Sequence, residues 1–559
     1  MPPRPVNLLV FRETRERVRG LHLKSALLRV LADFPARPSS ERVMAALLRA
    51  GELECAAADV DDAAAQTFSQ MTDRLAEALL QPESGIDCCA LTRNLTEAPV
   101  PHEVWVSPPE GFAYYALHPL AYAEAFEQIP TNADGVLVVG IRSIGTTLSA
   151  VTAAAARKHG LRAQRITVRP GGHPYNRRTQ FSLEQLDLIR RSSARGAAFL
   201  VVDEGPGLSG SSFLSVAEAL KEAGAPRDKI TLICGHQPDF DSLRADDGPR
   251  RARRFRWVAA ASEPHRPTQA NVFIGGGEWR RRLFVDQRAW PASWTTLERL
   301  KYLSSDQGAH ARLFNFLGFG HYGQQVLQRQ EKIAAAGFGP APCRESEGFA
   351  SYCWLRGRPM SAEDLSPNVL QSLAEYCAFR SKVLAADVAD LSPLEQMTEH
   401  NLRELRIDQP VALKIEHPTI CDGRMQPHEW LLTEDGRMLK TDSGSHGDDH
   451  FFPGPTDIAW DLAGVIVEWR MNPAQREFFL EAYRRASGDD AQFRVADFSI
   501  AYALFRLAYC RMAANALPGT DEEARLILAA AKYGQAMEEL GPLTVPQLDD
   551  PGRNLLYFH

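Results

Sequence analysis

Short apolar runs alternate with amphipathic stretches over the second quarter of the chain. The runs begin near Gly135, Gln164, Ala197 and Lys229, and helical periodicity follows from Thr147, Ser182 and Gly210. Runs that are apolar at successive positions indicate strands buried on both faces. Strands that alternate with helices predict a doubly wound parallel sheet, in which ligands bind at the carboxyl ends of the strands. We therefore assign residues 101–275 to an α/β domain of this class.

A turn suited to anions follows one of these strands. The strand ends at Val202, Asp203 and Glu204 come next, and the loop after them contains Gly205, Gly207, Leu208, Ser209, Gly210, Ser211 and Ser212. Glycines let a phosphate approach the backbone, while serine hydroxyls and the N–H groups at a helix start donate hydrogen bonds to it. Adjacent carboxylates accept hydrogen bonds from vicinal sugar hydroxyls or hold Mg²⁺. The turn therefore predicts a site for a phosphorylated sugar.

This segment resembles the phosphoribosyl-pyrophosphate loop of type I phosphoribosyltransferases. In that family a strand, two acids and a Thr/Ser-Gly-Gly-Thr turn lead into a helix, and here Ser209-Gly210-Ser211-Ser212 stands at the last part. The loop is one residue longer than the family pattern, and serines replace threonines. Its glycine spacing, G-x-G-x-x-G, also fits a dinucleotide-binding turn, but the two acids would repel a pyrophosphate there. An ordinary glycine-rich turn is the other alternative.

A second strand-to-turn unit lies upstream, at residues 135–147. Its turn contains Arg142, Ser143, Ile144, Gly145 and Thr146. In the resembled family the corresponding turn binds pyrophosphate, and a mobile basic loop closes over it. The resemblance therefore implies stabilisation of the leaving charge by Arg142 and by four later residues, Arg169, His173, Arg177 and Arg178. A solvated basic turn explains any one of these four equally well.

The resemblance implies an activity for residues 101–275. It implies transfer of ribose 5-phosphate between phosphoribosyl pyrophosphate and a base or other acceptor, with Mg²⁺ as cofactor. Asp203 and Glu204 would hold the ribose hydroxyls and the metal. Phe112, Tyr114 and Tyr115 are aromatic candidates for stacking on a base, although burial in the core explains each of them too. A sensor that binds a nucleotide or phosphosugar without turnover is the alternative, and the sequence specifies neither the acceptor nor the direction of the reaction.

Motifs after residue 276 resemble the aminoglycoside phosphotransferase branch of the kinase-like fold. Gly423 and Pro427 keep positions of the family's catalytic loop, Asp442 stands at the metal-binding Asp, and Asp461 lies at the start of a helix. The resemblance implies an α+β bilobal domain over residues 276–559, in which Asp442 and Glu429 would bind Mg²⁺. Whether this domain also binds ATP is left open by the sequence. The chain then carries a phosphoribosyltransferase-like domain and a kinase-like domain.

The kinase-like motifs depart from the family at the chemical positions. Arg424 stands where the catalytic Asp belongs, and Glu429 stands where the metal-binding Asn belongs. Because an Arg cannot accept a proton, phosphotransfer would need Asp422 or His428 instead. The strand-like run 312–320 contains no lysine, so we expect a degenerate kinase-like domain that binds a ligand or acts as a scaffold. A cluster for a divalent ion is a further candidate, made of Asp442, His446, Asp448, Asp449 and His450.

The length and composition of the chain limit the number of domains, the classes of binding partner and the expected cellular compartment. The 559 residues predict two or three domains, of which residues 1–100 form a small α/β region. The net charge of −7 gives no general attraction for nucleic acid or an anionic membrane. Nine scattered cysteines without a C-x-x-C pair predict reduced thiols. With no signal-peptide pattern and no long apolar window, we expect a soluble cytoplasmic protein whose partner is a small phosphosugar or nucleotide; a homo-oligomer is left open.

Overall fold

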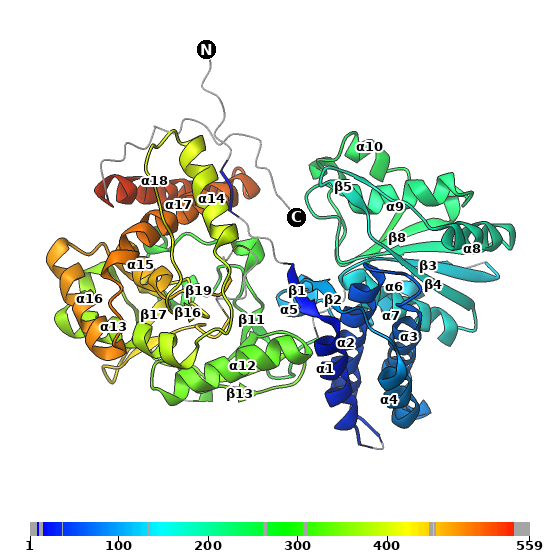
Figure 1. The fold of residues 1–559 in the computed structure, drawn as a ribbon, viewed down its shortest axis with the longest axis horizontal. Coiled ribbons are helices and arrows are strands. Elements are labelled where there is room, and N and C mark those ends of the chain that lie inside the picture. The colour runs from blue at the N-terminus through cyan, green and yellow to red at the C-terminus, as the bar shows by residue number, and fades with distance from the viewer. Residues whose placement is uncertain are drawn as a thin grey trace, which may run out of the picture.

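The chain folds into two bodies that meet side by side, as Figure 1 shows. The structure is a computed structural model that describes residues 8–10, 15–35, 37–130, 133–260, 265–305, 310–445, 451 and 454–540. The first body runs from the amino-terminal helices through a parallel sheet, and the second contains the later strands and helices (Figure 1). None of the described helices is both long and apolar enough to cross a membrane.

A five-stranded parallel sheet forms the centre of the first body. Its order is β4-β3-β7-β8-β9, with β3 at Gly135–Ile141, β4 at Arg162–Val168, β7 at Ala198–Val202, β8 at Ile230–Cys234 and β9 at Arg256–Ala259. Every residue of β3 is buried, which explains its unbroken apolar run. The chain passes from β3 outward to β4 and then crosses to β7. The strand order therefore reverses between β3 and β7, where sheets of this class bind ligands.

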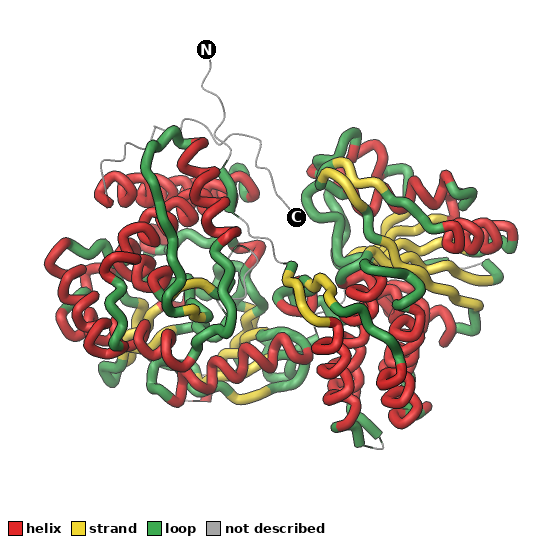
Figure 2. The backbone as a smooth tube through the Cα atoms, viewed as in Figure 1, coloured by secondary structure: helices red, strands yellow, loops and turns green. Residues whose placement is uncertain are grey.

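Helices cover both faces of this sheet, so the parallel, doubly wound arrangement predicted from the sequence is present. On one face α7 (Ile144–Lys158) packs against Val136, Val138 and Leu200. On the other, α9 (Ser211–Glu222) and α8 (Leu183–Ala194) pack against the alternate side chains of the same strands. In Figure 2 the yellow strands of this body lie between red helices.

The amino-terminal region is mainly helical, which differs from the small α/β region expected for residues 1–100. It contains α1 (Gly20–Ala32), α2 (Ser40–Ala58), α3 (Gln66–Leu80), the short 3₁₀ turn η1 (Pro82–Ser84) and α4 (Cys88–Glu97). A single described strand, β1 (Glu16–Arg19), pairs with β2 (Glu103–Val106). Buried Arg165 on β4 joins the helices to the sheet through ion pairs of 2.7 Å to Glu54 and 2.7 Å to Asp73. The helices and the sheet therefore share one core.

The second body begins with an antiparallel sheet. Its order is β10-β11-β12-β14-β13, with β10 at Val272–Phe273, β11 at Lys301–Leu303, β12 at Arg312–Phe316, β14 at Phe349–Cys353 and β13 at Cys343–Arg344. Helix α12 (Gly320–Ala335) connects β12 to β13. Because β10 pairs with β11, the second body begins before residue 276, the boundary expected from the sequence.

Short strands and long helices complete the second body. The strands are β15 (Gly357–Pro359), β16 (Pro418–Thr419), β17 (Trp430–Thr433), β18 (Met438–Lys440) and β19 (Thr456–Asp457). The helices are α13 (Pro367–Val383), α14 (Ser392–Glu404), α15 (Ala459–Glu468), α16 (Pro473–Ser487), α17 (Gln492–Ala516) and α18 (Asp521–Leu540). Their apolar side chains form a core that includes Trp430, Trp460 and Trp469.

A short helix, α5 (Glu110–Ala113), lies where the two bodies meet. The carbonyl of Phe112 accepts a hydrogen bond of 3.0 Å from the Phe319 N–H of the second body. The carbonyl of Ala113 accepts one of 3.3 Å from Nη1 of Arg299. Phe316 and Phe319 pack into the same core as Phe112. The junction is therefore apolar and hydrogen-bonded at once.

Candidate functional site

Two acids lie at the carboxyl end of β7, where the strand order reverses. Tyr122 donates a hydrogen bond of 2.6 Å to the carbonyl of Asp203, and the Glu204 carbonyl accepts one of 2.6 Å from the Gly235 N–H. Burial raises the pKa of both carboxyls, Asp203 and Glu204, to about 7. A hydrogen bond from the Gly111 N–H partly offsets this increase in the pKa of Glu204. Burial therefore disfavours the charged form of each acid, a common property of functional sites.

The glycine- and serine-rich loop then leads into α9. Gly207 and Gly210 have φ angles of 55° and 71°, which favour glycine, and α9 begins directly after Gly210. The Ser209 and Ser211 hydroxyls donate to the Pro174 carbonyl, over 2.9 Å and 2.5 Å. Pro174 lies in the hairpin of β5 (Gly171–His173) and β6 (Asn176–Arg178). Two hydroxyls predicted to bind a phosphate thus hold this hairpin against the loop, while Gly205, Leu208 and Ser212 complete the turn.

The turn after β3 lies against the acids. A side chain at Gly145 would come within 2.6 Å of the Val202 carbonyl and 3.4 Å of Oδ1 of Asp203, so only glycine fits there. The two turns that the sequence predicts to share a site are thus adjacent. Ser143 has φ 110° and ψ −123°, a conformation that costs energy for a residue with a side chain. Ile144 and Thr146 are buried behind it.

The predicted cations of this site already have partners in the first body. Arg142 forms ion pairs with Asp62 and, at 3.5 Å, with Asp59. Arg169 binds Asp59 at 2.7 Å. Arg177 donates to the Pro170 carbonyl over 3.2 Å, and burial together with Arg169 lowers the pKa of its guanidinium. Asp59 and Asp62 lie just after α2, far in sequence from Arg142 and Arg169, so the local sequence around these two arginines does not reveal the ion pairs.

The cavity beside Ser143 is small. Ser143, Ile144 and Arg169 line it together with Cys55 and Glu52 of α2, and its volume is about 30 Å³. A cavity of this size holds about two water molecules. Binding of a phosphosugar at this cavity would therefore require the hairpin or the helices to move.

The second body contains a larger pocket, of about 240 Å³. Lys301 of β11 and Asn315 of β12 lie directly opposite each other in the sheet. Lys301 forms an ion pair with Asp442, and Nδ2 of Asn315 donates to Oδ1 of Asp442 over 3.0 Å. Burial alone would lower the pKa of Lys301, but Asp442, Glu298 and Glu429 together raise it. Residues 312–320 contain no lysine, and Lys301 on the neighbouring strand is the lysine that reaches Asp442.

Two acids of this pocket lie on connected backbone segments. The Thr441 N–H donates to the Glu429 carbonyl over 2.9 Å, and its hydroxyl lies 3.3 Å from Oε2 of Glu429. Asp442 follows with φ 51°, a left-handed conformation that Asp tolerates better than most residues. Oδ1 of Asn315 is buried there without a hydrogen-bond partner among the described residues. These oxygen atoms match the ligands that Mg²⁺ prefers. Residues 446–450 of the predicted acidic cluster, His446, Asp448, Asp449 and His450 among them, lie outside the described residues.

The loop at residues 421–424 is held by buried acids. Oδ1 and Oδ2 of Asp461 accept hydrogen bonds of 2.8 Å from the N–H groups of Gly423 and Asp422. Asp422 is fully buried and accepts a hydrogen bond of 2.5 Å from Tyr376. Asp422 therefore has a structural role and is poorly placed to accept a proton from a substrate.

Arg424 and His428 line the pocket beyond this loop. Burial lowers the pKa of His428 to about 4, so at neutral pH its ring is uncharged and can accept a proton. Its ring faces that of Trp279, with centroids 6.4 Å apart. Of the two substitutes for the catalytic Asp considered from the sequence, His428 is the one exposed to the pocket.

The aromatic candidates for base stacking lie elsewhere than expected. Phe112 is buried in the core of the first body. Tyr114 and Tyr115 line the pocket of the second body, and Arg299 lies 5.0 Å from the centre of the Tyr114 ring. The first body thus contributes side chains to the pocket of the second.

Comparisons with known proteins give limited guidance. No protein-family model matches the sequence, and no curated protein matches it. Similar solved structures include a choline/ethanolamine kinase family protein from Mesorhizobium loti, with 18% identity, 48% of this chain and 95% of that chain covered, and a TM-score of 0.30. A macrolide 2′-phosphotransferase from Brachybacterium faecium has 14% identity, 46% and 97% coverage and a TM-score of 0.30. These scores are too low to establish a shared fold.

Proposed function

We propose that the second body binds a nucleoside triphosphate with Mg²⁺ and transfers a phosphoryl group to a small-molecule acceptor. The observation that carries this proposal is the group of Lys301, Asn315 and Asp442, which lies in a pocket of about 240 Å³. A lysine, an amide and carboxylates at one end of a cavity suit a charged, metal-bound phosphate chain. Glu429, joined to Thr441, adds the second carboxylate.

Each side chain has a role in this proposal. Asp442 and Glu429 would hold Mg²⁺, which neutralises charge on the phosphates. Lys301 would then turn from Asp442 towards a phosphate oxygen. Phosphoryl transfer depends mainly on positioning and on electrostatic stabilisation, so an Arg at position 424 is compatible with the reaction. Neutral His428 is the candidate to take the proton of the acceptor hydroxyl.

Two substitutions test the nucleotide site. Asp442→Asn removes the metal-binding charge and Lys301→Met removes the phosphate-binding charge, so each should weaken binding of Mg·ATP at least about tenfold. Matched controls are Asp435→Asn, an exposed acid in the β17–β18 turn, and Lys332→Met on the exposed face of α12. Calorimetric titration measures binding, and release of ADP with candidate acceptors measures transfer. Equal affinity in all four variants would contradict the proposal.

A second function is proposed for the parallel sheet. The acids Asp203 and Glu204, with pKa values raised to about 7, favour a ligand that supplies hydroxyl donors or Mg²⁺. Phosphoribosyl pyrophosphate has both a sugar diol and phosphates, and Arg142 and Arg177 lie on the loops that would meet its pyrophosphate. We propose that it binds there, with transfer of ribose 5-phosphate as the reaction.

Thermal stabilisation by phosphoribosyl pyrophosphate would detect this binding, since a ligand of the folded state raises the melting temperature. Exchange of labelled pyrophosphate into phosphoribosyl pyrophosphate, with candidate bases present, would then report turnover. Binding without exchange favours a sensor over an enzyme. A protein that shows no stabilisation with the ligand at millimolar concentration lacks this site.

A further inference from the structure

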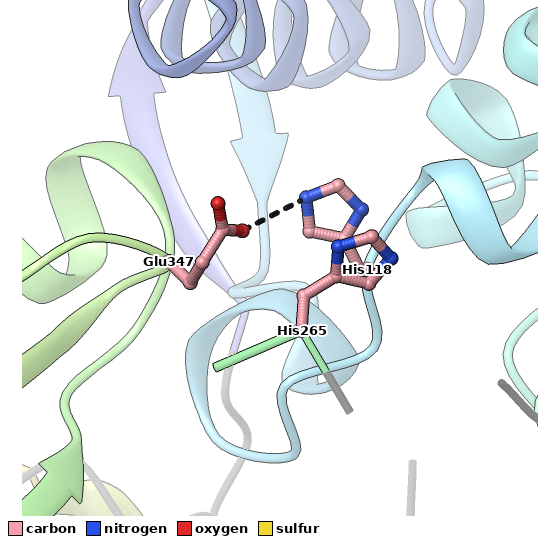
Figure 3. Close-up of side chains that lie close together, drawn as sticks. All are labelled: His118, His265 and Glu347. Carbon is pink, nitrogen blue, oxygen red and sulfur yellow. Dashed lines mark ion pairs between the residues drawn. The ribbon is translucent and has the colours of Figure 1, made fainter. Parts of the chain in front are cut away.

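Three potential metal ligands from distant parts of the chain meet at the junction of the two bodies. His118 lies between α5 and α6 (Leu120–Glu127), His265 lies on the segment between β9 and β10, and Glu347 lies in the turn between β13 and β14. One ligand atom from each lies within 4.8 Å of the other two. Figure 3 shows the Glu347 carboxylate facing the His118 ring, with the His265 ring stacked beside it.

The contacts of these side chains define a partly enclosed site. Nε2 of His118 lies 3.4 Å from Oε2 of Glu347, and the His118 side chain is only 6% exposed. The two imidazole rings lie 4.0 Å apart between centroids, at 18° to each other. The Glu347 and His265 side chains are 35% and 28% exposed, so they have room to reorient. Glu124, on α6, adds a second carboxylate 4.0 Å from Nε2 of His265.

We propose that His118, His265 and Glu347 bind a divalent transition-metal ion, with Zn²⁺ as the best match. Two imidazoles and one carboxylate form a ligand set typical of zinc, and they leave a fourth position for water or for Glu124. Mg²⁺ and Ca²⁺ fit less well because they prefer oxygen ligands throughout.

The proton balance of this binding can be written from the hydrogen bonds present. Nδ1 of His118 accepts a hydrogen bond of 3.2 Å from the Leu120 N–H, so Nε2 carries the proton and faces Glu347. Coordination through Nε2 moves that proton to Nδ1, and the bond from Leu120 is lost. A long neutral hydrogen bond is weak compared with a metal–imidazole bond, so the exchange favours the ion.

The ion would fasten the two bodies together. His118 lies on the segment between α5 and α6, and Gly111 and Ala113 of α5 contact Glu204 on one side and Arg299 on the other. Glu347 lies in the turn that joins β13 to β14 of the second body. A metal bound here would therefore restrain the segment that follows α5, a helix that contacts both candidate sites.

Metal binding by the full-length chain without a histidine tag tests the proposal. Zn²⁺ is titrated in competition with a chromogenic chelator, and Co²⁺ absorption reports the coordination geometry. We expect one tight equivalent in the wild type, with affinity lowered at least about tenfold in His265→Asn and in Glu347→Gln. The matched control is His159→Asn, which removes an exposed His that lies 3.8 Å from Glu127. This control should bind as the wild type does.

Two results would overturn the site. One is the absence of a stoichiometric site in the wild type. The other is unchanged affinity in both variants, which would assign the ion to exposed thiols such as Cys89, Cys343 and Cys353. Circular dichroism verifies that the variants are folded, and Zn²⁺ should raise the melting temperature of the wild type more than that of Glu347→Gln.

Discussion

The two candidate sites neutralise their carboxylates in opposite ways. In the second body Asp442 is already paired with Lys301 and hydrogen-bonded to Asn315. In the first, Asp203 and Glu204 have no Lys, Arg or His nitrogen within 4.0 Å among the described residues, and burial raises their pKa values to about 7. Binding a cation or a diol would relieve the unfavourable charge of the first site. The second site must instead exchange one partner for another when its ligand binds.

The same contrast extends to the segments that support each site. In the second body Asp422 and Asp461 are fully buried, and Arg380 lies 3.5 Å from each of them. Lys440 lies 3.5 Å from Asp422. Removing one member of such a buried group leaves a buried charge without an opposite charge beside it, which is strongly destabilising. The pocket loop is therefore held by internal charges, whereas the acids of the first site depend on backbone N–H groups.

The largest loss of stability is expected from Asp461→Ala. It removes the oxygen atoms that accept hydrogen bonds from the Asp422 and Gly423 N–H groups. It also removes one of the negative charges beside the buried Arg380. We expect a loss of about 3 kcal/mol in the free energy of unfolding. Chemical denaturation measures this loss, and hydrogen exchange should show faster exchange of the two amides. In the control, Asp490→Ala, an exposed Asp loses one acceptor of the Gln492 N–H and should cost less than about 1 kcal/mol. Equal losses would mean that the loop does not depend on Asp461.

The sequence predicted the local elements of the first site well, for a physical reason. Strands buried on both faces read as apolar runs, and the observed β3 and β7 lie where those runs are. The turn from Gly205 to Ser212 could also be predicted from the sequence, because positive φ angles such as those of Gly207 and Gly210 favour glycine. These features depend on neighbouring residues alone.

Features that depend on strand register or on distant segments were not predicted. Lys301 meets Asp442 because β11 pairs with β12 in a register that neither strand encodes alone. Arg142 pairs with Asp62, which lies 80 residues earlier in the chain. The grouping of His118 with Glu347 likewise requires the two bodies to be joined. In each case the missing information is three-dimensional.

An effect that depends on pH is expected from the double variant Asp203→Asn, Glu204→Gln. Both folded-state pKa values lie near 7, above unfolded values of about 4, so the folded protein binds more protons between these limits. The stability of the wild type therefore falls as pH rises from 4 to 7 on account of these groups. The amides do not titrate, so between pH 5 and pH 8 the variant should gain stability relative to the wild type, by about 2.5 kcal/mol for each of the two groups.

Urea denaturation at the two pH values measures this difference. The control is Asp228→Asn, which removes an exposed carboxylate that precedes β8 and lies outside the site. The same double variant should lose stabilisation by phosphoribosyl pyrophosphate if the acids hold its sugar. If the variant is destabilised equally at both pH values, the two acids are charged in the wild type and are stabilised by partners in the folded protein. The first site would then stabilise its carboxylates in the same way as the second site stabilises Asp442.

The smallest effect is expected from Ser209→Ala with Ser211→Ala, which frees the β5–β6 hairpin. Two neutral hydrogen bonds to the Pro174 carbonyl are lost at a partly exposed position, so global stability should fall by about 1 kcal/mol. The local effect should be larger, with faster hydrogen exchange and faster proteolysis at residues 171–178. Ser193→Ala, which removes a hydrogen bond of 2.7 Å to the Gly224 carbonyl away from the hairpin, is the control and should leave that segment unchanged. If the hairpin is equally protected in both variants, the serine hydroxyls do not hold it and are available to bind a phosphate. The first site would then be more open to a ligand than the small cavity beside Ser143 indicates.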